Sequence, residues 1–318
     1  MEDTLPVIDI CALAGADEPA RGRVAQSIGS ACRDVGFFAI VGHQVPVGLV
    51  EQTFEAAAQF FALPLQTKQR LAIDGLGGNR GYVGLGVEAL DEHRGPDHKE
   101  AFNIVWTDGR TRAGNVWPDV AQFQETVQRY FDTVLAVGRQ LHRAFALDLE
   151  LPEDYFADKL DAPMATLRLL HYPGASAEPV GAPAGAGAHT DYGNVTLLAT
   201  DAVAGLQVRR RDGRWMDVPH LPGAFVCNIG DCLMRWTNHR YVSTPHRVQA
   251  PRAPRQSIAM FVAPNPQAWV SAIPSCVAPG ERPLYEPILA QAYLAQRFAA
   301  TYSGHSAGTD DASAPLRL

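Results

Sequence analysis

The first half of the chain has apolar residues spaced mainly for helices. They recur at intervals of three and four, which is typical of helices with one buried face. Four ranges show this pattern: 21–35, 46–63, 64–71 and 118–147. In the last of them, Trp117-Pro118-Asp119 fits a helix start with proline in the first turn. The apolar runs 5–10 and 36–42 predict short buried strands among these helices.

From about residue 160 the pattern changes to short apolar runs separated by turn residues. The predicted strands are 165–172, 188–200, 205–211, 214–218, 223–229, 246–249, 257–262 and 269–272. About eight short strands in succession are typical of a double-sheet barrel or jelly roll. A further helical pattern covers 285–302.

The predicted fold is therefore mainly β with helices, and it has four parts. We expect an N-terminal α/β helical part (1–155) packed on a jelly-roll core (156–268), then a closing strand and helix (269–302) and a mobile tail (303–318).

Composition and charge exclude several classes of protein. The chain has 318 residues, is 47% apolar and 19% charged, and contains no run of the roughly 18 apolar residues that a membrane span needs. Its first residues carry no pattern of a secretory signal. The net charge of −7 makes nucleic acid and anionic membranes poor partners. The five cysteines include no C-x-x-C pair, so we expect reduced thiols and no structural zinc site.

These observations predict a soluble, cytoplasmic protein that acts on a small molecule. Its abundant Arg and Ala residues, with only three Lys, suggest a GC-rich bacterial genome.

Candidate metal ligands lie in a run with a strand pattern. His189 and Asp191 are separated by one residue, so on a regular strand they share a face, about 7 Å apart along the backbone. His246, beside another predicted strand, can supply a third ligand. Two His and one carboxylate leave positions open on six-coordinate iron(II), as in non-haem iron oxygenases. The same groups also suit a zinc hydrolase, and His-x-Asp alone is often only a hydrogen-bonded polar pair.

A second pair of residues has the chemistry of a carboxylate clamp. Arg255 and Ser257 open a predicted strand and share one of its faces. The guanidinium offers a bidentate fork, and the hydroxyl adds one more donor. An isolated arginine at a strand start more often faces water, so this hypothesis depends on its position after His246.

With these motifs the chain resembles the isopenicillin N synthase-like family of iron(II), 2-oxoglutarate-dependent oxygenases. The resemblance is dense over residues 160–266 and thinner over the N-terminal part. The matching blocks are HTDYG at 189–193, GLQV at 205–208, PGAFVCNIGD at 222–231, STPHRV at 243–248 and RQS at 255–257.

The resemblance implies a double-stranded β-helix core and a defined set of site residues. Iron is expected on His189, Asp191 and His246, and 2-oxoglutarate on Arg255, Ser257 and Tyr172. The implied reaction consumes O2 and converts 2-oxoglutarate to succinate and carbon dioxide while a C–H bond of the substrate is oxidised. Hydroxylation is the default outcome, and desaturation or ring closure are variants.

The substrate is less well defined by the sequence. Four residues are candidate substrate contacts: Phe102, Asn103, Tyr192 and Asn228. We expect an amino acid, a peptide or a natural-product scaffold, in a biosynthetic or catabolic role. Three alternatives stay open: an iron oxidase that uses no 2-oxoglutarate, an ethylene-forming fragmentation of 2-oxoglutarate, and a non-catalytic ligand-binding barrel. Succinate formation would separate the first of these from the leading hypothesis.

Overall fold

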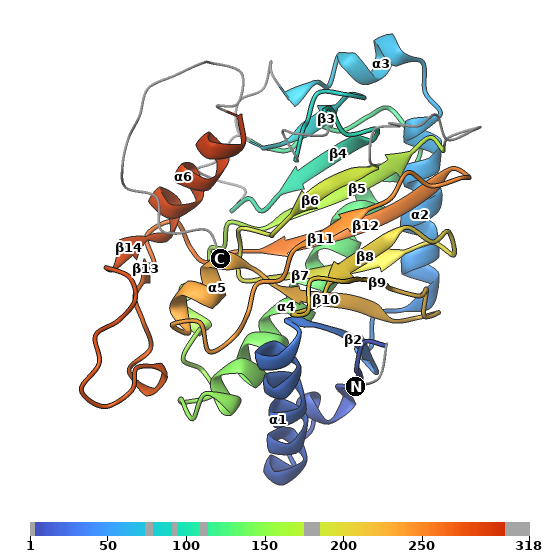
Figure 1. Cartoon of the computed structure of the whole chain (residues 1–318). Helices are drawn as coiled ribbons and strands as arrows, with labels where there is room; N and C mark the ends of the chain where they lie inside the picture. Colours follow the sequence, from blue (N-terminus) through green and yellow to red (C-terminus); the bar gives the residue numbers. More distant parts are fainter. Residues whose placement is uncertain (1–3, 74–78, 91–94, 109–113, 175–184, 303–318) are drawn as a thin grey trace, which may run out of the picture.

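Two β-sheets face each other at the centre of the protein (Figure 1). The computed structural model describes residues 4–73, 79–90, 95–108, 114–174 and 185–302. Its strands are β1 (Val7–Asp9), β2 (Phe37–Val41), β3 (Gly81–Val83), β4 (Glu100–Val105), β5 (Thr166–Tyr172), β6 (Ala186–His189), β7 (Val195–Thr200), β8 (Leu206–Arg209), β9 (Trp215–Asp217), β10 (Phe225–Ile229), β11 (His246–Val248), β12 (Arg255–Val262), β13 (Trp269–Val270) and β14 (Ile288–Leu289).

The large sheet has the order β1-β2-β10-β7-β12-β5-β4-β3, and the small sheet has the order β6-β11-β8-β9. Strands far apart in sequence are therefore neighbours, as the double-stranded β-helix requires, and the predicted fold class is confirmed. Strands β1 to β4 come from the N-terminal part and extend the large sheet. Strands β13 and β14 pair separately.

Helices pack around the sheets. They are α1 (Glu18–Asp34), α2 (Val47–Phe61), α3 (Leu65–Gln69), α4 (Phe123–Asp148), α5 (Asp231–Trp236) and α6 (Ala290–Tyr302). Helix α4 packs on β7 and β12, and its buried residues Val127, Tyr130 and Val134 follow the predicted helical spacing. No helix in the described ranges is long and apolar enough to cross a membrane.

Two predicted helix starts were wrong. Helix α4 begins at Phe123 and not at Pro118, because Gln122 has a positive φ of 58° that a right-handed helix cannot continue through. The closing helix α6 begins at Ala290, since the preceding residues form β14. The predicted mobile tail lies outside the described residues.

The interval predicted as one strand, 188–200, is two strands in different sheets. Strand β6 ends at His189 and β7 begins at Val195, so the chain crosses between the sheets at the candidate ligand Asp191. Backbone hydrogen bonds fix this crossing, because the amide of Asp231 donates to the Asp191 carbonyl at 2.7 Å. Gly230 permits the close approach, since a Cβ there would lie 2.2 Å from the Gly193 oxygen.

The register of β12 against β5 brings the predicted clamp residues together. Arg255 pairs with Tyr172, and Ser257 pairs with Leu170. Because side chains alternate along a strand, all four share one face of the large sheet. Arg168 lies two residues before Leu170 on β5 and shares that face. One face of these two neighbouring strands thus carries the predicted clamp residues and, further along β5, Arg168.

Candidate active site

Three side chains converge where the end of β6 meets the start of β11. His246 lies opposite His189 in the ladder between these strands. The Oδ1 atom of Asp191 lies 3.9 Å from Nε2 of His189 and 3.8 Å from Nε2 of His246. One ligand atom from each residue lies within 4.8 Å of the others, a spacing that suits a single metal ion. No other group of three His, Cys, Asp or Glu side chains in the described chain converges in this way.

Both imidazoles are oriented by backbone carbonyls. Nδ1 of His189 donates to the oxygen of Gly187 at 2.7 Å, and Nδ1 of His246 donates to the oxygen of Thr244 at 3.2 Å. A carbonyl can only accept, so the proton of each neutral ring sits on Nδ1 and leaves the Nε2 lone pair for a metal. Burial and the neighbouring His246 lower the pKa of His189 to about 3, so this ring is neutral at pH 7.

One carboxylate oxygen of Asp191, Oδ2, accepts two hydrogen bonds, and the other, Oδ1, faces the two histidines. Oδ2 accepts from Thr196 Oγ1 at 2.5 Å and from Asn228 Nδ2 at 2.7 Å. Burial by itself raises the pKa of Asp191, but the two histidines and these hydrogen bonds together hold it below its usual value. An ionised carboxylate with Oδ1 available and two imidazoles that present Nε2 fit iron(II).

Replacing Asn228 with leucine is expected to weaken metal binding without removing a ligand. The substitution keeps the volume but removes the donor that fixes Asp191 Oδ2. Loss of a group that orients a metal ligand usually lowers affinity by about 10–100-fold. Titration of the metal-free protein with Co(II) measures this change. Asn265→Leu is the control, because within the described structure the hydrogen bonds of that side-chain amide go to the 158–162 segment. Equal affinity in the Asn228 variant would mean that Thr196 alone orients Asp191.

Arg255 is buried and forms no ion pair within the part of the chain that the structure describes. Its side chain is 1% exposed, and Nε donates to the oxygen of Val203 at 3.2 Å. Nη1 lies 3.3 Å from Ser257 Oγ, and the guanidinium stacks at 4.9 Å over the ring of Tyr172. Among the described residues no acidic side chain forms an ion pair with Arg255. A buried cation without a counter-ion is costly, so this place favours an anionic ligand.

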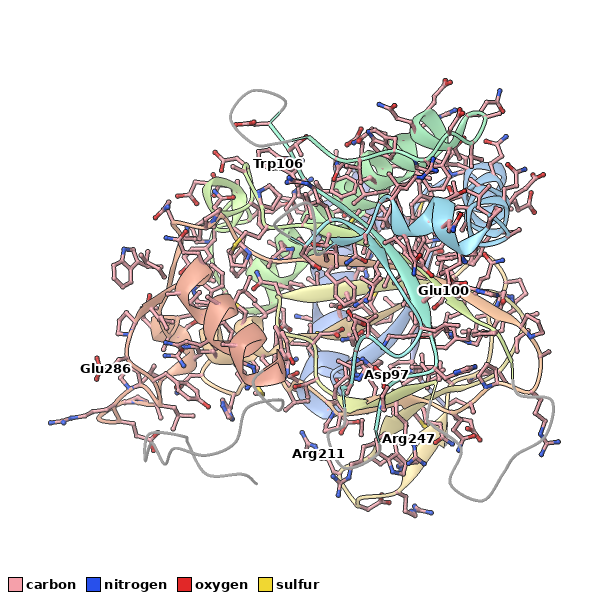
Figure 2. All side chains as sticks on the ribbon, turned by 90° about the horizontal axis from the view of Figure 1, so that it is seen from above. Asp97, Glu100, Trp106, Arg211, Arg247 and Glu286 are labelled. Carbon is pink, nitrogen blue, oxygen red and sulfur yellow. The ribbon has the colours of Figure 1, made fainter. Side chains whose placement is uncertain are left out.

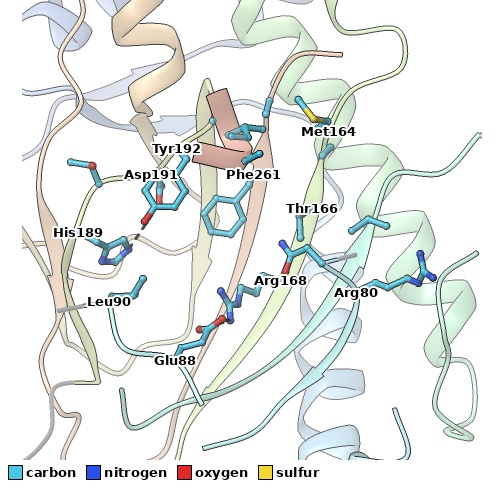
Figure 3. A pocket seen from close by; sticks show the side chains of 18 of the residues that line it. Arg80, Glu88, Leu90, Met164, Thr166, Arg168, His189, Asp191, Tyr192 and Phe261 are labelled. Atoms are coloured by element: carbon cyan, nitrogen blue, oxygen red, sulfur yellow. Dashed lines mark hydrogen bonds and ion pairs between the residues drawn. The ribbon is translucent and has the colours of Figure 1, made fainter. Parts of the chain in front are cut away.

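A cavity of about 630 Å³ opens beside the metal ligands. It is lined on one side by His189 and Asp191, and its further walls include Tyr192, Phe261, Leu90, Met164, Leu294, Glu88 and Arg168 (Figure 3). Arg168 Nη2 lies 2.6 Å from both carboxylate oxygens of Glu88. Burial alone raises the pKa of Glu88, but Arg168 and Lys99 lower it to about 2, so the pair is ionised.

The four candidate substrate contacts differ in where they lie relative to the cavity. Tyr192 lines the cavity. Asn228 does not, and instead donates to Asp191. Asn103 reaches the cavity only indirectly, because its amide donates at 2.9 Å to Asn79, which lines the wall. Phe102 lies on the opposite face of β4, fully buried in the hydrophobic core.

Phe102→Ala is therefore expected to act on stability and not on substrate binding. Its ring lies 4.6 Å from the ring of Phe60 and 5.7 Å from that of Phe123. Truncating a buried Phe usually costs about 3–5 kcal/mol of unfolding free energy. Urea unfolding measures that loss, and the KM of the protein that remains folded should be unchanged. A raised KM in a variant of wild-type stability would instead mean that Phe102 contacts the substrate.

Most of the cavity wall was not predicted from the sequence, and the residues concerned include Phe261, Arg168 and Glu88. Phe261 and Arg168 share the inner face with the clamp residues, so strand alternation from Ser257 and Tyr172 could have identified them. Glu88 lies outside any helix or strand, and no local sequence signal marks it as a cavity residue.

Comparison with protein-family models gives two matches. Residues 5–120 match the model described as non-haem dioxygenase in morphine synthesis N-terminal, and residues 163–264 match the 2OG-Fe(II) oxygenase superfamily.

Similar proteins and structures cover nearly the whole chain. The 2-oxoglutarate-Fe(II) type oxidoreductase hxnY of Emericella nidulans is 36% identical over 89% of this chain and 86% of its own. A homoarginine-6-hydroxylase of Oryza sativa is 33% identical over 91% of this chain and 96% of its own. The crystal structure of a full-length Neurospora crassa protein in complex with alpha-KG and thymine superposes with a TM-score of 0.87 at 33% identity, over 94% of this chain and 97% of that one. The protein therefore belongs to the iron(II)- and 2-oxoglutarate-dependent dioxygenases.

Proposed function

We propose that the cavity binds a small, flat, polar ring compound and that the enzyme hydroxylates a carbon held near His189 and Asp191. Iron(II), when bound, supplies the activation of O2 that couples 2-oxoglutarate decarboxylation to C–H oxidation. In this proposal His189, Asp191 and His246 hold the iron. Arg255, Ser257 and Tyr172 hold the distal carboxylate of 2-oxoglutarate, and the buried, uncompensated guanidinium is the observation that carries this assignment.

The cavity walls support a flat substrate with a polar edge. The rings of Tyr192 and Phe261 offer stacking surfaces, and apolar residues fill the space around them. The Glu88–Arg168 pair places acceptors and donors side by side. Its two charges cancel, so the pair favours a neutral partner with adjacent N–H and C=O groups over a strongly charged one.

The named compounds of similar proteins agree with this class in part. Two of the Neurospora crassa structures contain thymine or 5-formyluracil, which are neutral rings with such an edge. A basic amino acid is the second candidate substrate, because similar proteins are homoarginine hydroxylases and the cavity wall carries the carboxylate of Glu88. Bacterial origin, a biosynthetic role and a cytoplasmic location stay predictions.

A succinate-release assay with a small panel tests the substrate class. Thymine and uracil represent neutral rings, homoarginine a basic amino acid, and indole-3-acetate an aromatic acid. We expect a neutral ring to raise succinate formation about 10-fold or more above the substrate-free rate, and Glu88→Gln to raise its KM. Stimulation by homoarginine or the acid alone would contradict the proposed class. Anaerobic addition of 2-oxoglutarate to the iron(II) protein should first give a charge-transfer band, which confirms that the co-substrate binds.

A further inference from the structure

A chain of buried charges lies directly behind the candidate ligand His189. Lys99 forms ion pairs with Asp97 and, at 3.3 Å, with Glu88, whose carboxylate is held in turn by Arg168. Asp97 is 2% exposed and Lys99 is 4% exposed. Figure 2 shows Asp97 and Glu100 along the same stretch of chain that leads into β4. The charges therefore extend from the cavity wall to the segment next to β6.

Asp97 connects this chain to the proposed iron ligand through one residue, Gly187. Its Oδ1 accepts the amide hydrogen of Gly187 at 2.9 Å, and the carbonyl of Gly187 accepts Nδ1–H of His189 at 2.7 Å. Both Gly187 and Asp97 are buried, so water does not compete for these bonds. A change in the backbone at Gly187 would move the carbonyl that orients the imidazole of His189.

Strand β6 needs such an anchor because of its place in the sheet. It is an edge strand of the small sheet, paired on one side with β11. Its register against β11 is irregular between the pairs His246↔His189 and Val248↔Ala186, which leaves an extra residue on β6. A bulge of this kind disrupts the regular ladder at Gly187. Asp97 supplies an acceptor for an amide there.

We propose that Asp97 is a positioning residue for His189, and that Lys99 is the counter-ion that keeps Asp97 in place and joins it to the substrate-facing Glu88. The proposal rests on His189 being an iron ligand, as proposed above. It concerns residues that do not touch the metal, the co-substrate or the reacting carbon. It predicts that the metal site is sensitive to the acceptor at position 97 even when all three ligands are intact.

Two double variants isolate that acceptor. Asp97→Asn with Lys99→Met removes both charges but keeps an oxygen that can accept from Gly187. Asp97→Leu with Lys99→Met removes the charges and the acceptor. Neither variant strands an unpaired charge between positions 97 and 99, and Glu88 keeps Arg168 in both. The two proteins differ only at position 97, in whether the side chain can accept the Gly187 amide hydrogen.

Co(II) binding to the metal-free protein, followed by visible absorption, is the first measurement. We expect the asparagine variant to bind Co(II) within about 3-fold of the wild type. The leucine variant should bind about 10-fold more weakly or worse, with an altered absorption spectrum, the scale usual for groups that orient metal ligands. Amide hydrogen exchange in the metal-free protein should be faster at Gly187 in the leucine variant only. If that variant does not fold, Asp97→Ala with Lys99→Met, set against the asparagine double variant, carries the same comparison.

A matched control separates positioning from general stability. Lys68 and Glu100 form another buried ion pair at 2.7 Å, and Glu100 also contacts Tyr82 and His171 but not β6. Lys68→Met should lower the unfolding free energy and leave the Co(II) spectrum unchanged. Glu88→Gln should change the substrate KM and leave Co(II) affinity within about 2-fold.

Failure of the role proposed for Asp97 and failure of the proposed function would give different results. Equal Co(II) affinity and spectra in the two folded double variants would overturn the role of Asp97. Failure of the wild type itself to bind Co(II) would instead contradict the ligand set of His189, Asp191 and His246.

Discussion

His246→Ala is expected to remove iron binding and lower turnover by about 1,000-fold or more. This exceeds the 10–100-fold usual when only a group that orients a ligand is lost. The substitution leaves one imidazole and one carboxylate at a place where three groups are spaced to hold one metal ion. The anaerobic charge-transfer band with 2-oxoglutarate should vanish, and succinate formation should fall with it.

His43→Ala is the matched control for this variant. Nε2 of His43 bonds to the oxygen of Gly223 at 2.9 Å, and its ring lies 4.5 Å from that of Phe225 at a tilt of 44°, so it is a histidine packed against the large sheet. It contacts no residue of the metal site in the described structure, and its loss should leave the band intact. A His246→Ala protein that still binds one iron and shows the band would sink the assignment of His246.

The shared face of Arg255 and Ser257 could be predicted from the sequence because β12 is long and regular. Arg255 and Ser257 are two apart on an eight-residue strand, so alternation alone places them on one face. The same rule was applied to His189 and Asp191, but β6 ends at His189. Their ligand atoms still converge, because the following turn is held by the amide of Asp231. The convergence was predicted, and the reason for it was not.

Strand β4 shows why the substrate contacts could not be predicted with the same success. Its residues Glu100–Ile104 are all buried, so no alternation of polar and apolar residues tells which face meets the cavity. Phe102 and Asn103 were therefore chosen together, although they point to opposite faces. The partner of Asp97 lies 90 residues away at Gly187, and only the folded chain brings them together.

The N-terminal part thus has a role in the active site beyond packing. It supplies Glu88 and Leu90 to the cavity wall and Asp97 and Lys99 behind His189. The candidate metal ligands and the candidate clamp residues all lie in the core, which explains why the sequence of the core sufficed to predict the reaction but not the substrate.

Arg255→Met is expected to raise the KM for 2-oxoglutarate by about 100-fold while iron binding persists. Removing one partner of a buried, hydrogen-bonded charge pair costs about 2–5 kcal/mol. Ser257→Ala removes a weaker contact, worth about 0.5–1.5 kcal/mol, so its KM should rise less than about 15-fold. Initial rates of succinate formation against 2-oxoglutarate concentration measure both changes.

The unfolding free energy measured without 2-oxoglutarate gives an independent test, because Arg255→Met should weaken co-substrate binding without lowering the stability of the ligand-free protein. Among the described residues the buried guanidinium of Arg255 forms no ion pair, so methionine in its place should leave the unfolding free energy of the ligand-free protein unchanged or raise it. Saturating 2-oxoglutarate should stabilise the wild type, by about 2.7 kcal/mol at 100 times Kd, and should do little for the variant. Arg247→Met is the control, because that arginine stacks at 4.1 Å on Trp215 and bonds to Gln207. An Arg255→Met enzyme with the wild-type KM for 2-oxoglutarate would mean that the clamp holds the substrate instead of the co-substrate.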